Sequence, residues 1–277
     1  MSGVLERTLG ILELLSRHGE GVELGAIADG LNMPPSAAHR MLADLMRLGY
    51  VRQARNRGGY LLTTKLVSMG LSYLSQSGIV DVAQPLLNQM AELSGELVRL
   101  SVVDGERLTW VARAQGARQG LRYDPDMGSD ARLSCSSSGW AWLSTLSDEA
   151  VLALVSRQGL GSPQEFGPAA PTSLQQVMDA VQSARTDGVA IAVDTYSLGL
   201  SSVSAPVRFD GQAAMGVLTV AGPTVRLTPE RMLALAPHLM ATAQQLAVAS
   251  GTSPFFRMTA ETGGGMTSEG RRPIYAV

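Results

Sequence analysis

Three consecutive serines follow the chain's only cysteine in the segment RLSCSSSGWAWL, which runs from Arg132 to Leu143. Hydroxyl and thiol groups in such a segment could act as nucleophiles in acyl transfer, or they could donate hydrogen bonds to a bound ligand. A hydrolase of the nucleophile-elbow type requires Gly-x-Ser-x-Gly, but no glycine stands two residues before Ser137. A Ser-x-x-Lys pair is also missing, because the only lysine is Lys65. The spacing of these residues therefore gives little support to catalysis by Ser137.

The thiol of Cys135 would need a histidine base in order to act as a nucleophile. The three histidines, His18, His39 and His238, are scattered along the sequence, and the last lies in an apolar stretch. One cysteine excludes an internal disulfide, and the scattered histidines predict no metal site, so we expect no cofactor. A hydrolase that uses Ser137 or Cys135 stays open as an alternative function.

The same segment also suits ligand binding. Serines followed by Gly139 and the apolar run WAWLSTL predict a loop that enters a helix. Free backbone amides at the start of that helix, together with the hydroxyls of Ser137 and Ser138, would bind a carboxylate. An ordinary serine N-cap without any ligand would give the same pattern.

The first part of the chain carries a basic patch, although the whole chain has a net charge of -2. Five arginines stand against one acid, Asp44, between residues 40 and 60, which suggests an anionic partner such as DNA. Apolar residues at spacings of three and four predict three short helices, with a tight turn at Asn32 before the third. Two strands, Tyr50 to Ala54 and Gly59 to Thr63, follow as a hairpin. This order is typical of a winged helix-turn-helix domain.

The third helix would enter the major groove of double-stranded DNA. Small side chains at its start allow close approach, basic side chains one turn on reach phosphates or guanine edges, and arginines at the tip of the hairpin reach the backbone. The predicted DNA-binding residues are Ser36, Ala37, His39, Arg40, Arg47, Arg55 and Arg57.

The block PPSAAHRMLADLMRLGYV resembles the recognition helix of the IclR-type transcription regulators, and GGYLLTTKLVSMG is similar to the Tyr-x-Leu-Gly-x-x-Leu pattern at the end of that family's wing. The chain departs from the family at three positions: Asn32 replaces a usual glycine, Ala37 a common threonine and Thr63 the wing glycine. Ala37 removes one possible DNA contact, so the family's operator preference does not carry over. The resemblance covers about residues 4 to 250. It implies a regulator that binds an operator and responds to a small effector.

The resemblance and the pattern together predict an α+β chain with four parts. Residues 1–61 form the winged helix-turn-helix, 62–78 a linker helix, 79–250 a GAF-like effector-binding domain, and 251–277 a flexible C-terminal extension. Hairpins at Asp104-Gly105 and Asp210-Gly211 predict a mostly antiparallel sheet. The resemblance implies that the linker helix helps to pair subunits into a dimer or a dimer of dimers, whereas its periodicity alone fits a surface helix equally well.

The family's effector pocket carries over to individual positions of this sequence. Ala221 lacks a hydroxyl that the family often has, Trp140 stands where a lysine is common, and the match at Asp194 could be off by two residues. The apolar lining would come from the segment before the serines, although each such residue could be simple core. The predicted effector-binding residues are Ser137, Ser138, Asp194, Ser202, Thr219, Ala221, Leu121, Tyr123, Met127 and Trp140. The balance between polar and apolar side chains among these residues favours a larger or aromatic acid as the effector.

We therefore predict a ligand-responsive transcription regulator, a repressor of a catabolic operon that senses a small organic acid. The sign of regulation is not encoded locally, so an activator is compatible too. No stretch approaches the ~18 apolar residues of a membrane span, which favours a soluble cytoplasmic protein. A non-sensing architectural DNA binder is a further alternative, and only a sensor gains heat stability from the right acid.

Overall fold

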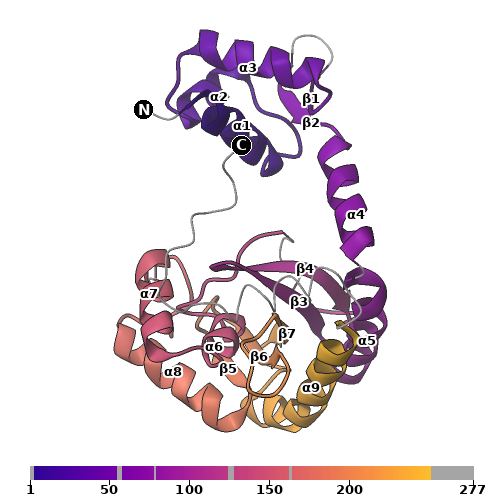
Figure 1. Ribbon diagram of the computed structural model, residues 1–277, viewed down its shortest axis with the longest axis vertical. Helices are drawn as coiled ribbons and strands as arrows, with labels where there is room; N and C mark the ends of the chain where they lie inside the picture. Colours follow the sequence, from indigo (N-terminus) through magenta and orange to yellow (C-terminus); the bar gives the residue numbers. More distant parts are fainter. Residues whose placement is uncertain (1–2, 55–57, 78, 124–127, 162–163, 251–277) are drawn as a thin grey trace. The chain divides into compact units, whose positions relative to one another are not determined.

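A computed structural model describes residues 3–54, 58–77, 79–123, 128–161 and 164–250. The chain forms two compact units that divide between Gln76 and Ser77, and each is described by itself (Figure 1). Helices and antiparallel strands occur together in the chain, as predicted for an α+β protein. Within the described ranges, no helix combines the length and the apolar character that crossing a membrane requires.

The N-terminal unit is a winged helix-turn-helix. Its elements are α1 (Val4–Ser16), α2 (Leu24–Gly30), α3 (Pro35–Arg47), β1 (Val51–Gln53), β2 (Tyr60–Leu62) and α4 (Lys65–Ser77). Asn32 has a φ of 47°, so the predicted left-handed turn between α2 and α3 is confirmed. Ile11, Ile27 and Leu42 are fully buried at the centre of the three helices.

The wing and the following helix differ slightly from their predicted bounds. Val51 of β1 pairs with Leu62 of β2, and both strands are shorter than predicted. Leu62 belongs to the strand, so α4 begins at Lys65 rather than at the predicted residue 62. Thr63, which replaces the family's wing glycine, accepts a hydrogen bond through Oγ1 from the amide of Lys65, the first residue of α4, at 3.2 Å.

The C-terminal unit is built on one five-stranded sheet in the order β4-β3-β7-β6-β5, in which all neighbours are antiparallel. The hairpins predicted at Gly105 and Gly211 are both present, each with glycine at positive φ. The elements are α5 (Ile79–Ser94), β3 (Leu97–Asp104), β4 (Arg107–Gln115), α6 (Ser137–Leu143), α7 (Asp148–Gln158), α8 (Leu174–Asp187), β5 (Ala190–Val193), β6 (Leu200–Val207), β7 (Gly216–Pro223) and α9 (Pro229–Ser250).

The two faces of this sheet differ in chemistry. Helices α5 and α9 cover one face with an apolar core to which β3 contributes Val98 and Leu100. Helices α6 and α8 cover the other face, whose core includes Trp110 and Val217. Because side chains alternate along a strand, Arg99 of β3 points away from the apolar core and toward the α6 side. The α6 face of the sheet therefore carries a buried charged side chain.

Candidate DNA-binding and effector sites

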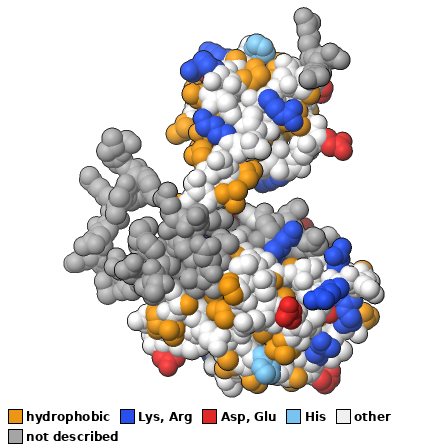
Figure 2. All heavy atoms as spheres, turned by 90° about the vertical axis from the view of Figure 1, so that its right-hand side faces the viewer, with side chains coloured by type: hydrophobic (Ala, Val, Ile, Leu, Met, Phe, Trp, Pro, Cys, Tyr) orange, Lys and Arg blue, Asp and Glu red, His pale blue; other side chains and the backbone are white. Residues whose placement is uncertain are grey.

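Helix α3 presents its predicted DNA-contacting residues on the side opposite its core. Ser36, His39 and Arg40 are exposed and Ala37 is half-buried, whereas Ala38 is fully buried. Basic side chains are visible on the surface of this unit in Figure 2. The amphipathic sequence of α3 thus brings small residues and Arg40 together on one accessible face.

The remaining predicted arginines are less well defined. The Arg47 guanidinium lies 3.2 Å from the Asp44 carboxylate, and because both side chains are well exposed this pair is weak and leaves Arg47 accessible. Arg55 and Arg57 lie outside the described residues. Arg52 of β1 is exposed and is a further phosphate-binding candidate that only the basic composition of residues 40 to 60 indicated.

The start of α6 is a serine N-cap. Ser136 Oγ accepts a hydrogen bond from the Gly139 amide at 3.0 Å, and it donates one to the Arg132 carbonyl at 2.6 Å. The expectation that free amides at this helix start would bind a carboxylate is therefore wrong for Gly139, because the chain's own hydroxyl occupies that amide. The hydroxyls of Ser137 and Ser138, which follow, are the other groups that the sequence assigned to a ligand.

Five buried hydroxyls form a continuous hydrogen-bonded group, here called the hydroxyl cluster: Ser137, Ser138, Ser202, Ser204 and Thr219. Ser137 Oγ lies 2.7 Å from Ser202 Oγ and 2.8 Å from Ser204 Oγ. Thr219 Oγ1 lies 2.9 Å from Ser138 Oγ and 2.8 Å from Ser204 Oγ. The fold thus joins α6, β6 and β7 through residues that the sequence singled out, and it adds Ser204, which two-residue periodicity from Ser202 could have indicated.

Two predicted pocket residues lie on or near the same strands but differ in role. Ala221 is buried on β7 opposite Ser202, next to the hydroxyl cluster. Asp194 has a φ of 55°, and its Oδ1 accepts a hydrogen bond from the Gly199 amide at 2.6 Å. This oxygen of the carboxylate therefore holds the turn before β6, and an effector contact by Asp194 stays a prediction.

The predicted apolar lining is mostly not assembled around the cluster. Leu121 is 66 % exposed, so it is not part of a buried lining. Trp140 is buried in the core on the α6 side, and its Nε1 donates to the Ser134 carbonyl at 3.1 Å, which is a structural role. Met127 lies outside the described residues. Tyr123 is half-buried, and its position beside Arg99 is described below.

A buried arginine that the sequence analysis did not indicate lies on the same face of the sheet. Arg99 is only 2 % exposed, and its guanidinium carbon lies 3.5 Å from the centre of the Trp110 ring. Within the described part of the chain, its Nε and Nη2 have no hydrogen-bond partner, and neither do Ser101 Oγ and Trp110 Nε1. Strand pairing places Arg99 opposite Thr219 and Ser101 opposite Trp110, so these groups adjoin the hydroxyl cluster.

Burial shifts the ionisation of this neighbourhood without changing its charges at neutral pH. It lowers the pKa of Arg99 to about 10, although the nearby Tyr123 and Tyr196 act in the opposite direction. Burial also raises the pKa of the Tyr123 hydroxyl to about 12, while Arg99 acts to lower it. Arg99 therefore remains a cation and Tyr123 a neutral phenol at pH 7.

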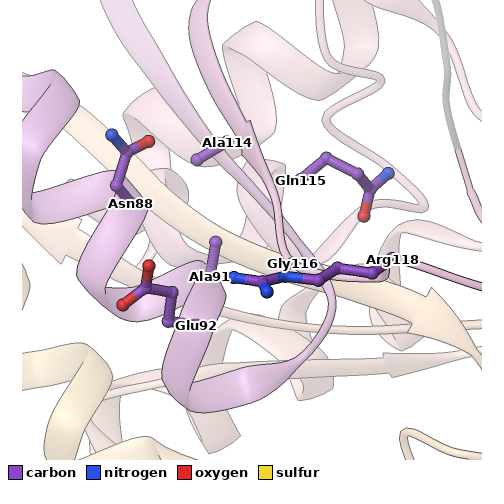
Figure 3. A pocket seen from close by; sticks show the side chains of 7 residues that line it. All are labelled: Asn88, Ala91, Glu92, Ala114, Gln115, Gly116 and Arg118. Carbon is purple, nitrogen blue, oxygen red and sulfur yellow. The ribbon is translucent and has the colours of Figure 1, made fainter.

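A cavity of about 510 Å³ lies elsewhere, between α5 and the end of β4. Figure 3 shows Asn88 and Glu92 on α5, Gln115 at the end of β4, and Arg118 extending toward Glu92. Of the predicted effector residues that the structure describes, none lines it. This cavity is a polar surface hollow, distinct from the hydroxyl cluster.

Two family profiles cover most of the chain. The profile of the IclR helix-turn-helix domain matches residues 4–55, and that of the C-terminal domain of bacterial IclR transcriptional regulators matches residues 71–248. The chain belongs to the IclR family. The predicted resemblance to the family is confirmed, and the first match includes the block PPSAAHRMLADLMRLGYV around α3.

Curated IclR-family relatives are aligned over nearly their whole length. The HTH-type transcriptional repressor AllR of Salmonella typhimurium is 25% identical over 250 residues, which are 90% of each protein. The acetate operon repressor of the same species is 27% identical over 248 residues, or 89% of each protein. The IclR-family chain is thus similar to two transcriptional repressors.

Solved structures share the fold. A transcriptional regulator of Alicyclobacillus acidocaldarius gives a TM-score of 0.78 at 22% identity, over 91% of this chain and all of that one (100%). An IclR homologue of Microbacterium hydrocarbonoxydans, crystallised with 4-hydroxybenzoate, gives 0.75 at 18% identity with the same coverage. These similarities confirm an IclR fold with an N-terminal helix-turn-helix and a C-terminal effector domain.

The single thiol of this IclR-family protein is expected to react slowly in the native state. Cys135 is fully buried, and burial raises its pKa to about 11, so little thiolate exists at pH 8. We expect iodoacetamide at pH 8 to label native Cys135 at least about tenfold more slowly than the protein unfolded in urea. Mass spectrometry of timed samples measures both rates. Equal rates would mean that the thiol is accessible and activated, as a nucleophile requires.

Proposed function

We propose that this protein is a DNA-binding repressor of a catabolic operon. Its affinity for the operator falls or rises when a small organic acid binds, and it catalyses no reaction. The observation that carries the proposal is the pairing of an exposed, basic α3 with a second unit that has a buried polar sheet face. Its relatives include two repressors, which supports the same sign here. Because its target is chromosomal DNA, we place it in the cytoplasm.

We propose that the effector binds at the hydroxyl cluster in a GAF-like domain, with Ala221 beside it. An aromatic acid is supported by neighbouring rings: Trp110 and Tyr196 lie edge to face with centroids 6.4 Å apart, and Phe166 lies 5.6 Å from Tyr196. A related protein was crystallised with 4-hydroxybenzoate, an acid of this class. Ser137, Ser138, Ser202 and Thr219 would exchange hydrogen bonds with its polar groups.

We propose that two subunits, or two pairs of them, act together on the operator. Apolar side chains of α4 support pairing because Val67, Met69 and Leu71 are all more than half exposed. Pairing would set two winged helices on two half-sites. The acid would act by binding the DNA-competent and incompetent arrangements of the dimer with unequal affinity.

The proposal is tested by titrating DNA from immediately upstream of the protein's own coding region, with random DNA as the competitor, at two salt concentrations. Specific binding should weaken with salt because phosphate contacts release counterions. Arg40→Ala should weaken binding to the upstream DNA by about 5- to 150-fold, the range for losing one base contact. Fluorescence anisotropy of labelled DNA measures each affinity.

Arg157→Ala is the matched control, because it removes one positive charge from an exposed side chain of the C-terminal unit. It should leave the affinity within about twofold, since a single distant charge changes long-range attraction only slightly. Equal affinity of the wild type for upstream and random DNA would contradict local regulation. Equal losses in both variants would mean that Arg40 acts through net charge alone.

A further inference from the structure

We propose that Arg99 binds the carboxylate of the effector through Nε and Nη2 and so anchors the effector in its site. This inference rests on the proposed function, because it takes the effector to be an organic acid bound on the α6 face of the sheet. It adds a specificity-determining residue that the sequence did not indicate, and it names the group that any effector must carry.

Buried donors of Arg99 and its neighbours lack partners at one place in the structure. Arg99 is only 2 % exposed, yet its Nε and Nη2 have no hydrogen-bond acceptor among the residues that the structure describes. Ser101 Oγ and Trp110 Nε1 are unpartnered as well, and both flank Arg99 through strand pairing and ring stacking. Buried polar groups are nearly always hydrogen-bonded in native proteins, so a cluster of four unmet atoms indicates a missing partner.

The two free nitrogens form the side-on edge of the guanidinium, which matches a carboxylate. The same protein provides the template at Arg226, whose Nε and Nη2 donate to Glu96 Oε1 and Oε2 at 2.7 and 2.9 Å. A planar carboxylate satisfies this edge with two parallel hydrogen bonds. Arg99 thus presents the arrangement of Arg226 without its carboxylate, and an effector acid would supply it.

The site continues from Arg99 into the hydroxyl cluster. Arg99 is paired with Thr219 across adjacent strands, and Thr219 bonds directly to Ser138 and Ser204. Neighbouring strands lie about 4.8 Å apart, which is within the span of a small organic acid. An acid anchored on Arg99 would therefore lay its flat body near Trp110 and Tyr196 and direct a distal polar group to the hydroxyls.

The first test needs no ligand. If Arg99 has no counter-ion in the free protein, Arg99→Met should raise the unfolding temperature by about 2 to 4 °C, because an unpaired buried charge is removed. Arg226→Met is the matched control and should lower it, because it strips a buried carboxylate of its partner. Thermal unfolding followed by tryptophan fluorescence reports this unit, since all three tryptophans lie in it. A clear loss of stability in Arg99→Met would overturn the proposal.

The second test uses carboxylates and their neutral amides as probes: acetate with acetamide, and benzoate with benzamide. At about 10 mM, binding raises the unfolding temperature measurably even for a Kd of about 1 mM. At least one carboxylate should stabilise the wild type while its amide does not, and Arg99→Met should bind that carboxylate about 30-fold or more weakly. Arg157→Met, at an exposed arginine, should match the wild type.

The outcomes separate this inference from the proposed function. Unchanged carboxylate affinity in Arg99→Met would overturn the anchor while leaving acid sensing intact. Failure of both carboxylates to bind the wild type would overturn the anchor as well, and the operator titration would still decide whether the protein is a regulator. Asp124 and Asp126 follow Tyr123 in the sequence and lie outside the described residues. If changing both to asparagine creates carboxylate binding that the wild type lacks, the counter-ion is internal and the proposal falls.

Discussion

Replacing Gly139 with alanine is expected to destabilise the C-terminal unit by about 3 kcal/mol, near the upper end for overpacking in a core. A Cβ at this position would lie 2.6 Å from Leu133 Cα, 2.7 Å from its carbonyl oxygen and 2.9 Å from its carbonyl carbon. These are backbone atoms of the preceding loop, so rotation of a side chain cannot relieve the clash. The helix α6 must move instead, and the hydroxyls of Ser137 and Ser138 move with it.

The measurement is thermal unfolding followed by tryptophan fluorescence, with an expected fall of about 6 to 12 °C for a unit of this size. Gly25→Ala in α2 is the control, because a Cβ there meets nothing within 4 Å and alanine favours a helix. Gly25→Ala should leave the tryptophan transition unchanged. A Gly139→Ala protein as stable as the wild type would show that α6 is not held tightly against the Leu133 loop.

The winged helix-turn-helix was predictable because its determinants are local. The turn at Asn32, the start of α3 at Pro35 and the hairpin after Tyr50 each follow from residues within one short window. The errors are of one or a few residues at element ends, as at Leu62, which was expected both in the second strand and at the start of the linker helix and which pairs with Val51 in β2. Pairing between strands determines where such elements begin and end, and this pairing cannot be read from a single sequence.

The effector face was predictable only in part, because it depends on strand register. Ser137, Ser138, Ser202 and Thr219 were predicted through the family resemblance, and they are in hydrogen-bonded contact or share partners. Asp194 has a further role that the sequence did not indicate, because its positive φ and its hydrogen bond from the Gly199 amide place it in the turn before β6, while its effector contact stays a prediction. The family resemblance indicates which residues to consider, and the local backbone conformation shows what each of them contacts.

Arg99 could not be found from composition or motif. A lone arginine between Val98 and Leu100 in an apolar strand resembles an edge position with an exposed side chain. Its burial follows from β3 lying between β4 and β7, an order that only the assembled sheet establishes. Pairing between strands that are distant in the sequence therefore creates the polar neighbourhood of Arg99, Ser101 and Trp110. Nonlocal contact likewise brings Arg226 to Glu96.

Arg226→Met is expected to cost about 2 to 3 kcal/mol, less than a fully buried pair would, because Arg226 itself is about one-third exposed and partly screened. The loss removes two hydrogen bonds to Glu96, which is 3 % exposed, and a third from Nη2 to the Leu121 carbonyl at 2.8 Å. The carboxylate of Glu96 is then left buried without its cation, and this desolvation dominates the cost.

The double variant Glu96→Gln, Arg226→Met identifies that cause. Removing the stranded charge should restore part of the stability, so the double variant should unfold at a higher temperature than Arg226→Met alone, against the usual expectation that destabilising changes accumulate. Tryptophan fluorescence again reports the transition. If the losses of stability from the two substitutions simply add, Arg226 acts by packing rather than by pairing with Glu96. The proposal for Arg99 would then lose its support, because it depends on the contrast between a paired arginine at position 226 and an unpaired one at position 99.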